Sequence, residues 1–270
     1  MRVRYGSAVS YERMRPCVQP PLLIRHAVFG GPQPLFCIPL VAKDSAQLAA
    51  QAQVAHRLKP DVVEWRADSY DGIDAHTVLK VADSLRRTLD TEPIIFTLRI
   101  HSEGGAKPMD QNVRLQVIES VLRSELIDIV DLELSNGPQV LKPLVHNAHE
   151  HGKRVILSFH DFESTPNNDV LLDRISTMVG QGADIAKIAC MPKEHADVLR
   201  LLQVTSSARQ MFPSVPLCTM SMGRLGSITR VAGFLYGSDM AFAIGQEASA
   251  PGQIPIADAR AIAETLLRYA

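Results

Sequence analysis

The chain has 270 residues, 46% of them hydrophobic, and a formal net charge of -1. That length suits one large domain or two modest ones, with a substantial buried core. The balanced charge gives no electrostatic reason to expect binding to nucleic acid or to an anionic membrane. No apolar run approaches the roughly 20 residues that a membrane-spanning helix needs, so we expect no contact with a membrane.

The four cysteines, Cys17, Cys37, Cys190 and Cys218, lie far apart in the sequence. They form no CxxC pair and have no histidine partners at metal-ligand spacing. Such cysteines are typical of reduced, mostly buried thiols in a cytoplasmic protein. We therefore expect a cytoplasmic location and no zinc site.

The first 30 residues carry several arginines and prolines and show no sustained hydrophobic period. A transit peptide, rich in Arg and Ser and poor in acidic residues, fits them loosely, and a secretory signal fits worse because its apolar core is missing. The simpler interpretation is favoured. Residues 1–30 are then an N-terminal extension, or a short hairpin that closes one end of the domain that follows.

From Phe36 onward, short apolar and β-branched runs alternate with longer segments of helical periodicity. The predicted strands are Phe36–Val41, Val62–Arg66, Ile94–Leu98, Ile127–Leu132, Arg154–Ser158, Ile185–Ala189, Pro216–Thr219 and Met240–Ile244. The predicted helices are Ser45–Leu58, Ile73–Leu89, Asn112–Ser124, Gly137–His151, Asn168–Val179, Glu194–Arg209, Gly226–Tyr236 and Ile256–Tyr269. Helix-start signals agree, since Asp44 and Asp110 precede periodic segments and Pro138 and Pro166 lie near first turns.

This strict alternation of strands and helices predicts a parallel sheet covered by helices. Eight units without a long structureless insertion favour a closed (β/α)8 TIM barrel over an open doubly wound sheet. No Gly-x-Gly-x-x-Gly follows the first strand, which weakens the dinucleotide-binding alternative. We predict an α/β chain with one barrel domain over residues 31–270.

Charged residues recur at the carboxyl ends of the predicted strands, where the active sites of such barrels form. Glu64 and Arg66 end the second strand two residues apart, so alternation places them on the same face. Arg99 follows the third strand, and Asp131 and Glu133 end the fourth. The pattern indicates a polar site at one end of the barrel.

Lys187 lies in the predicted sixth strand, between apolar neighbours on both sides. Burial disfavours the ammonium form, so such a lysine can be partly neutral near pH 7 and act as a nucleophile. The alternative is a structural lysine that pairs with a barrel carboxylate such as Glu64 or Glu133. The strand pattern by itself leaves both interpretations open.

His160 ends the preceding strand, next to the strand of Lys187. A lone histidine at a strand end is more often structural than catalytic. Adjacent strands would, however, place this base beside an amine that can bind a carbonyl, which is the pair that imine-assisted proton abstraction needs. A catalytic role for His160 is therefore favoured.

Two segments rich in small residues follow the last two strands. Residues 220–230 open a helix, and their backbone N–H groups together with an arginine suit an anionic group, although an ordinary loop has a similar composition. Residues 246–253 are too long for a minimal connection. They indicate a mobile lid that offers Ser249 and Gln253.

Six segments together resemble the type I 3-dehydroquinate dehydratases, from about Phe36 to the C-terminus and in the family's order. They are EWRAD at 64–68, FTLR at 96–99 with EGG at 103–105, ILSFHDF at 156–162, ADIAKIA at 183–189, SMGRLGSITR at 221–230 and ASAPGQI at 248–254. The resemblance implies a (β/α)8 barrel, a homodimer, and an enzyme without metal or cofactor. It also implies conversion of 3-dehydroquinate to 3-dehydroshikimate and water.

The resemblance implies a role for each matching residue. Lys187 would form an imine with the C3 ketone, and His160 would take the C2 proton and protonate the departing C1 hydroxyl in a syn elimination. Glu103 would orient and tune His160. Substrate contacts would come from Arg230, which would clamp the carboxylate, from Ser249 and Gln253 in the lid, and from Glu64, Arg66 and Arg99 near the ring hydroxyls and neighbouring charges.

One position departs from the family pattern. Some members have a serine near the end of the first strand, where this chain has Pro39, which puts one substrate contact in doubt but not the chemistry. Two other functions remain as alternatives. One is a class I aldolase, which shares the barrel and the Schiff-base lysine. The other is a non-catalytic sensor derived from the same fold, against which the joint presence of Lys187, His160 and Glu103 argues. The sequence leaves open whether the enzyme serves aromatic amino-acid biosynthesis or quinate breakdown.

Overall fold

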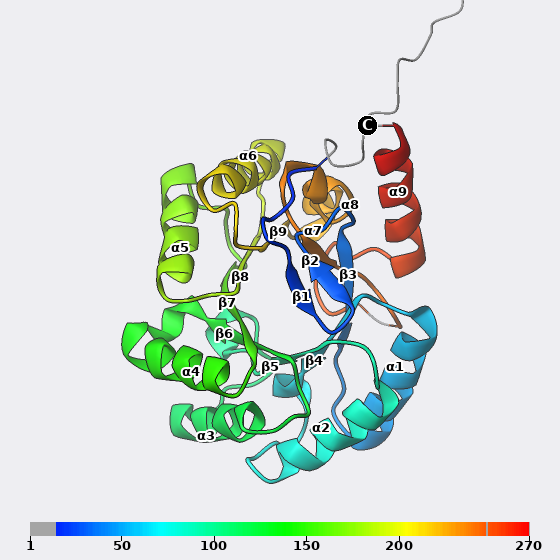
Figure 1. Ribbon diagram of the computed structural model, residues 1–270, viewed down its shortest axis with the longest axis vertical. Coiled ribbons are helices and arrows are strands. Elements are labelled where there is room, and N and C mark those ends of the chain that lie inside the picture. The colour runs from blue at the N-terminus through cyan, green and yellow to red at the C-terminus, as the bar shows by residue number, and fades with distance from the viewer. Residues whose placement is uncertain (1–14, 247, 270) are drawn as a thin grey trace, which may run out of the picture.

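The computed structural model describes residues 15–246 and 248–269, which alternate between strands and helices (Figure 1). The barrel strands are β3 Leu35–Leu40, β4 Val62–Arg66, β5 Ile94–Thr97, β6 Ile129–Glu133, β7 Arg154–Asp161, β8 Ile185–Cys190, β9 Leu217–Ser221 and β10 Met240–Phe242. The α-helices are α1 Ser45–Leu58, α2 Thr77–Thr88, α3 Gln111–Leu122, α4 Pro138–Glu150, α5 Asn168–Gly180, α6 His195–Met211, α7 Gly223–Gly226, α8 Ile228–Ala232 and α9 Ile256–Tyr269. Four 3-10 turns complete the set: η2 Ala67–Ser69, η3 His101–Glu103, η4 Leu134–Asn136 and η5 Gly233–Tyr236.

The eight strands form one parallel sheet in the order β10-β3-β4-β5-β6-β7-β8-β9, and the helices surround it. The sheet curls until its two ends lie side by side. At that seam the Asp239 N–H donates to the Leu217 carbonyl at 2.6 Å. The barrel is thus nearly closed, and the predicted (β/α)8 TIM barrel is confirmed.

The helix-start signals at Asp44 and Asp110 agree with the backbone, whereas α2 begins at Thr77, four residues after the predicted start at Ile73. The Asp44 carboxylate accepts a hydrogen bond from the Gln47 N–H, and the Asp110 carboxylate accepts from the N–H groups of Asn112 and Val113. Such side-chain caps satisfy amide groups that the first turn of a helix leaves without partners. Pro138 opens α4, where its missing N–H costs nothing.

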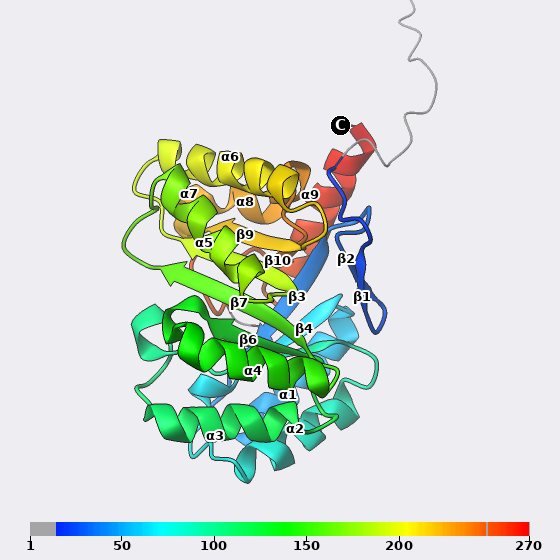
Figure 2. The same ribbon diagram turned by 60° about the vertical axis from the view of Figure 1, so that its left-hand side comes forward.

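A short antiparallel hairpin, β1 Leu22–Ile24 and β2 Ala27–Phe29, precedes the barrel. Figures 1 and 2 show it across the end at which the barrel strands begin. Phe29 is completely buried there, in a cluster with Leu35 and Val62 at the strand starts. Of the two forms proposed for the N-terminal segment, residues 22–29 adopt the hairpin. Residues 1–14 lie outside the described residues, and the domain boundary at residue 30 stays a prediction.

The predicted helix over Gly226–Tyr236 was wrong as one continuous element. The chain forms α7, α8 and η5 instead, with breaks next to Gly226 and Gly233. A Cβ at Gly226 would lie 2.3 Å from the Ser221 carbonyl oxygen, so a close approach of the chain to strand β9 occupies this place. α7 and α8 pack against β9, and η5 packs against α6 and α8, so buried apolar residues continue across the breaks.

Strand ends also differ from prediction. β7 continues three residues past Ser158 to Asp161, and β6 begins two residues later than expected, at Ile129.

Three of the cysteines, Cys37, Cys190 and Cys218, are buried thiols as expected, and Cys17 is half-buried. Within the described part of the chain, no helix is long and apolar enough to span a membrane.

Candidate active site

A cavity of about 580 Å3, including its open mouth, lies at the carboxyl end of the barrel strands. It is lined by Glu64, Arg66, Arg99, Glu103, Gly104, His160, Phe162, Lys187, Ala189, Met220, Met222, Arg230, Phe242, Ser249, Ala250 and Gln253. All nine residues selected from the sequence are in this set. The structure therefore brings together side chains that come from six strands or the loops after them.

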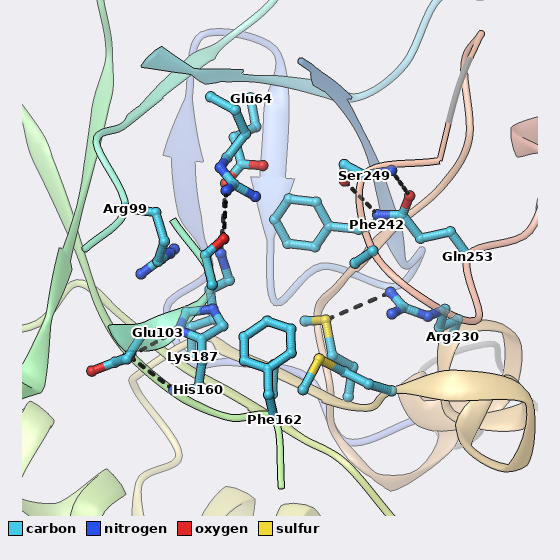
Figure 3. A pocket seen from close by; sticks show the side chains of 16 residues that line it. Glu64, Arg99, Glu103, His160, Phe162, Lys187, Arg230, Phe242, Ser249 and Gln253 are labelled. Carbon is cyan, nitrogen blue, oxygen red and sulfur yellow. Dashed lines mark hydrogen bonds and ion pairs between the residues drawn. The ribbon is translucent and has the colours of Figure 1, made fainter. Parts of the chain in front are cut away.

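Figure 3 shows how the charged groups divide within the cavity. Glu103, His160 and Lys187 lie on one side, and Arg230 lies on the other. The rings of Phe162 and Phe242 stand between them. A ligand in this space would meet a nucleophile and a base at one end and a cation at the other.

Lys187 projects into the barrel from the middle of β8 and is 4% exposed. Its Nζ donates to Asp131 Oδ2 at 2.8 Å and lies 3.6 Å from Glu64 Oε1. The ammonium also lies 4.5 Å from the centre of the Phe242 ring, which favours a cation. Two carboxylates and an aromatic face thus surround the amine.

Of the two interpretations left open for Lys187, the resting site agrees with the charged lysine paired with a carboxylate rather than with the partly neutral amine. Burial does lower the pKa of Lys187, but the charges of Asp131 and Glu64 outweigh it, and the net shift of the pKa is upward. Of the two carboxylates suggested as partners, Glu64 is near the amine and Glu133 is not paired with it. The sequence did not single out Asp131 as the direct partner, although its place at a strand end was a signal.

Asp131 is held by a dense set of donors inside the barrel. Its carboxylate accepts from Lys187, from Arg99 Nη2 at 2.9 Å and from Ser158 Oγ at 2.6 Å. Burial opposes its charge, but the nearby cations Arg99 and Lys187 hold the pKa of Asp131 far below its ordinary value. Asp131 is therefore a permanent anion beneath the amine.

Arg99 forms ion pairs with both Asp131 and Glu133. Its Nη1 donates to Glu133 Oε1 at 3.0 Å and to Ser158 Oγ at 2.8 Å. Although burial works against it, the carboxylates of Asp131 and Glu133 raise the pKa of Arg99 above its ordinary value. The expected contact of Arg99 with neighbouring charges is present, and its guanidinium forms part of the cavity wall.

His160 lies near the end of β7, beyond the point where Ser158 pairs with Lys187 in the register of β7 and β8. Its Nδ1 is 3.1 Å from Glu103 Oε2, which also accepts the backbone N–H of His160 at 3.0 Å. The other oxygen of Glu103 accepts from Ser135 Oγ at 2.5 Å. One oxygen of Glu103 therefore contacts both the backbone N–H and the ring of His160.

The environment keeps His160 neutral. Burial, followed by the positive charges of Arg99 and Lys187, holds the pKa of His160 well below its ordinary value. Burial also raises the pKa of Glu103, while the hydrogen bond from Ser135 works in the opposite direction. With Glu103 ionised, Nδ1–H donates to the carboxylate, and Nε2 is left as a proton acceptor.

The loop after β5 carries Glu103 and is fixed by the EWRAD segment. Arg66 and Asp68 form a two-pronged ion pair with both distances at 2.8 Å. Arg66 Nη2 also donates to the Gly104 carbonyl at 3.1 Å, and the Ala106 N–H donates to Asp68 at 2.9 Å. Arg66 therefore lines the cavity and braces the loop that positions Glu103.

Arg230 is the cation on the opposite side and is 3% exposed. Its Nη2 donates to the Pro251 carbonyl at 3.0 Å, and its buried Nε has no hydrogen-bond partner. Among residues 15–246 and 248–269, no carboxylate lies within ion-pair distance of it. Burial lowers the pKa of Arg230 to about 10, so an arriving anion would supply the charge partner that the described residues do not.

Ser249, Ala250 and Gln253, from the segment predicted as a lid, line the cavity. The Ser249 N–H donates to Gln253 Oε1 at 2.8 Å, and Gln253 Nε2 donates to Ser249 Oγ at 2.9 Å. The Gly223 N–H donates to the Pro251 carbonyl, so this backbone donor of residues 220–230 is used by the lid rather than left for an anion. Glu247, also part of the predicted lid, lies outside the described residues.

Several functional positions were missed from the sequence. The apolar wall of Phe162, Met220, Met222 and Phe242 is one group, and its signal was the occurrence of these residues directly at strand ends. Glu64 accepts a hydrogen bond from Thr97 Oγ1 at 2.8 Å, a buried contact that no spacing predicted. Pro39 pairs in register with Glu64 but is not among the residues that line the cavity.

The model of the type I 3-dehydroquinase family matches residues 36–269. The 3-dehydroquinate dehydratase of Geobacillus thermodenitrificans is 42% identical over 248 residues, which cover 91% of this chain and 96% of that protein. The enzyme of the same name from Bacillus subtilis is 38% identical, with coverage of 91% and 96%.

Solved structures agree with this match. The 3-dehydroquinate dehydratase of Geobacillus kaustophilus superimposes with a TM-score of 0.91 at 40% identity, covering 95% of this chain and 99% of that one. The type I enzyme of Clostridium difficile, solved with covalently modified comenic acid, gives a TM-score of 0.89 at 30% identity, with coverage of 93% and 99%. The likeness therefore extends over nearly the whole of both chains.

Proposed function

The chain belongs to the type I 3-dehydroquinase family and is a hydro-lyase of the 3-dehydroquinate dehydratase type, and we propose that it works through a Schiff base on Lys187. One observation supports this mechanism above the others. A buried lysine and a neutral histidine, the latter oriented by a carboxylate, line the same cavity. Opposite them lies Arg230, for which the described residues supply no ion-pair partner. These are the groups that an imine-assisted elimination from an anionic ketone requires.

The first step joins Lys187 to the substrate. The ammonium of Lys187 loses one proton, and its nitrogen attacks the C3 carbonyl carbon while the carbonyl electron pair moves to oxygen. That oxygen takes up this proton and a second one from the same nitrogen and leaves as water, so that a protonated imine with one N–H remains. Asp131, which accepts from Nζ at 2.8 Å, remains as its counter-ion and favours the charged form, which is the better electron sink.

The second step moves one proton and expels one hydroxyl. Nε2 of His160 takes the C2 proton, and the C–H electron pair passes into the imine to give an enamine. The enamine electrons then form the C1–C2 double bond as the C1–O bond breaks, and the imidazolium gives its proton to the leaving oxygen. Because one group acts at both positions, water leaves from a single face, and hydrolysis of the imine releases the enone.

The remaining groups hold the substrate. Arg230 would bind the carboxylate through two parallel hydrogen bonds, a geometry suited to a planar anion. Ser249 and Gln253 would cover it. Glu64, Arg66 and Arg99 would face the ring hydroxyls and the charge of the imine. No specific observation favours the aldolase or sensor alternatives over this assignment.

Reduction with borohydride in the presence of 3-dehydroquinate tests the proposal. The adduct is expected on the peptide that contains Lys187, and Lys187→Met should abolish both the adduct and turnover. Lys153→Met is a matched control, since Lys153 is 7% exposed and lies away from the cavity. An adduct that survives in Lys187→Met and disappears in Lys153→Met would overturn the assignment.

We further propose that the enzyme serves the shikimate pathway in the cytoplasm, as a homodimer without metal or cofactor. The family resemblance and the balanced charge support this. Rescue of an aromatic auxotroph that lacks the dehydratase tests the pathway. Light scattering tests the dimer, with an expected mass of twice 29.6 kDa; a monomer mass at working concentration would contradict it.

A further inference from the structure

Ser135 lies in η4, the short turn after β6, and does not line the cavity. Its hydroxyl nevertheless donates to Glu103 Oε1 at 2.5 Å. The opposite oxygen of the same carboxylate accepts the backbone N–H and faces the ring of His160. One serine on the barrel rim therefore fixes the rotation of the carboxylate that orients the base.

The state of Glu103 decides which nitrogen of His160 is free. When Glu103 is ionised, it accepts from Nδ1–H, and Nε2 keeps its lone pair for the substrate proton. When Glu103 is protonated, it can donate to Nδ1, and the ring then carries its proton on Nε2. In that form His160 has no acceptor left to face the substrate.

From these contacts we propose that Ser135 is a positioning residue for the dehydration, which acts by holding Glu103 ionised and so selecting the His160 tautomer with a free Nε2. The inference rests on the proposed role of His160 as the base. Ser135 touches neither the cavity nor the reacting groups, so its influence passes through Glu103 alone.

The groups around Glu103 and His160 shift the pKa of Glu103 in opposite directions. Around Glu103, burial and the negative charge of Glu133 raise its pKa, whereas the Ser135 hydroxyl, Arg99 and the His160 backbone N–H lower it. The charges of Lys187 on β8, Asp131 on β6 and Arg66 on β4 also act on His160, in addition to Arg99. Losing the hydroxyl removes a lowering contribution and leaves the raising ones, so the pKa of Glu103 moves up.

The direction in which kcat depends on pH follows from the role of Glu103. Turnover needs the carboxylate form of Glu103, so kcat is lost as the pH falls through the apparent pKa of the Glu103–His160 pair. In Ser135→Ala this acid limb is expected about 0.5 to 1 pH unit higher than in the wild type, and kcat below the limb about 3- to 10-fold lower. KM and the kcat plateau at higher pH should stay unchanged.

Two further variants make the experiment specific. Ser135→Thr keeps the hydroxyl and should restore the wild-type limb, and Ser120→Ala removes an exposed serine hydroxyl on α3 and should leave the profile unchanged. Because Ser135 is exposed, its truncation leaves no cavity in the core. The inference would be overturned if the acid limb of the kcat profile stayed in place in Ser135→Ala. It would also be overturned if this limb moved equally in Ser135→Ala and Ser135→Thr.

The experiment distinguishes a failure of the proposed role of Ser135 from a failure of the proposed mechanism on Lys187. Borohydride trapping on Lys187 at the pH plateau should be the same in Ser135→Ala and the wild type. If the wild type forms no Lys187 adduct, the mechanism fails. If it forms the adduct and only the pH limb stays in place, the mechanism stands and the role of Ser135 fails.

Discussion

Burial and the neighbouring carboxylates shift the pKa of Lys187 in opposite directions. Removal from water favours the neutral amine, whereas Asp131 at 2.8 Å and Glu64 at 3.6 Å favour the ammonium. The carboxylates prevail, and the pKa of Lys187 is raised. The resting site thus holds a charged lysine. In the proposed mechanism this lysine must lose a proton before it attacks, and the same anions then stabilise the charged imine.

At the same scale, His160→Ala should separate imine formation from proton transfer. Loss of general acid–base catalysis costs about 10²- to 10⁴-fold in kcat, whereas Lys187 and its counter-ion are retained. Turnover should fall by that factor, and mass spectrometry should still find the reduced adduct on Lys187. His146→Ala, at an exposed position on α4, is the control and should behave as wild type. Equal loss of adduct and turnover would mean that His160 builds the site and does not move the proton.

Arg230 should matter for binding more than for chemistry. In Arg230→Ala the substrate carboxylate loses a charged partner worth about 1.5–3 kcal/mol, which corresponds to a rise in KM of about 10- to 150-fold. Steady-state kinetics measure the change. Arg224→Ala, an exposed arginine of the same segment, should leave KM unchanged. A normal KM in Arg230→Ala would place the anion site elsewhere.

At the scale of elements, the loop that carries Glu103 depends on its glycine. Gly104 has φ +85°, in the left-handed region, and a Cβ there would lie 2.5 Å from the Phe162 ring. Phe162 comes from the chain just after β7, which also carries His160. The glycine therefore sets how closely the loops after β5 and β7 approach, and with them the Glu103–His160 distance.

Gly104→Ala should for this reason lower kcat. A displacement of Glu103 by about 1 Å can cost up to about 10²-fold, so we expect a loss of about 10- to 100-fold. Gly72→Ala is a matched control, because Gly72 also has a positive φ, +68°, but a Cβ there would meet nothing within 4 Å. Both variants should lose about 1–2 kcal/mol of stability through backbone strain. Equal activity in the two would show that the contact with Phe162 has no catalytic consequence.

At the scale of the whole molecule, the two ends of the barrel have different tasks. The carboxyl end holds the charged cavity. The opposite end is sealed by the β1–β2 hairpin, whose Phe29 fills an apolar cluster with the strand starts. Because the packed barrel interior separates them, a change at the sealed end should affect folding and leave the chemistry alone.

Phe29→Ala tests that separation. Removing a fully buried aromatic ring should lower the free energy of unfolding by about 3–5 kcal/mol, which is a drop in Tm of about 6–20 °C for a domain of this size. Calorimetry measures the drop, and KM and kcat well below Tm should be unchanged. Val28→Ala, at a residue 36% exposed, should change stability by no more than about 0.5 kcal/mol. A large rise in KM in Phe29→Ala would show that the two ends are coupled.

The sequence by itself determined the order of strands and helices and the barrel class, because buried strands and amphipathic helices leave periodic patterns that need no knowledge of contacts. Strand-end position selected Glu64, Arg66, Arg99, His160 and Lys187, because the strand ends of a barrel meet at one face. The long segment after the last strand offered Ser249 and Gln253, the family resemblance added Glu103 and Arg230, and the fold gathers all nine in one cavity. The family resemblance supplied their roles, which remain to be tested by the variants above.

Only the tertiary structure decided the charge of Lys187 and the links behind His160. Asp131 is 56 residues from Lys187 in the sequence, and Ser135 is 32 residues from Glu103. Whether two such groups lie within hydrogen-bond distance depends on register and loop paths, and a pKa depends on all the charges in reach. Periodicity records which face of an element is buried, but it does not record which polar atoms meet inside.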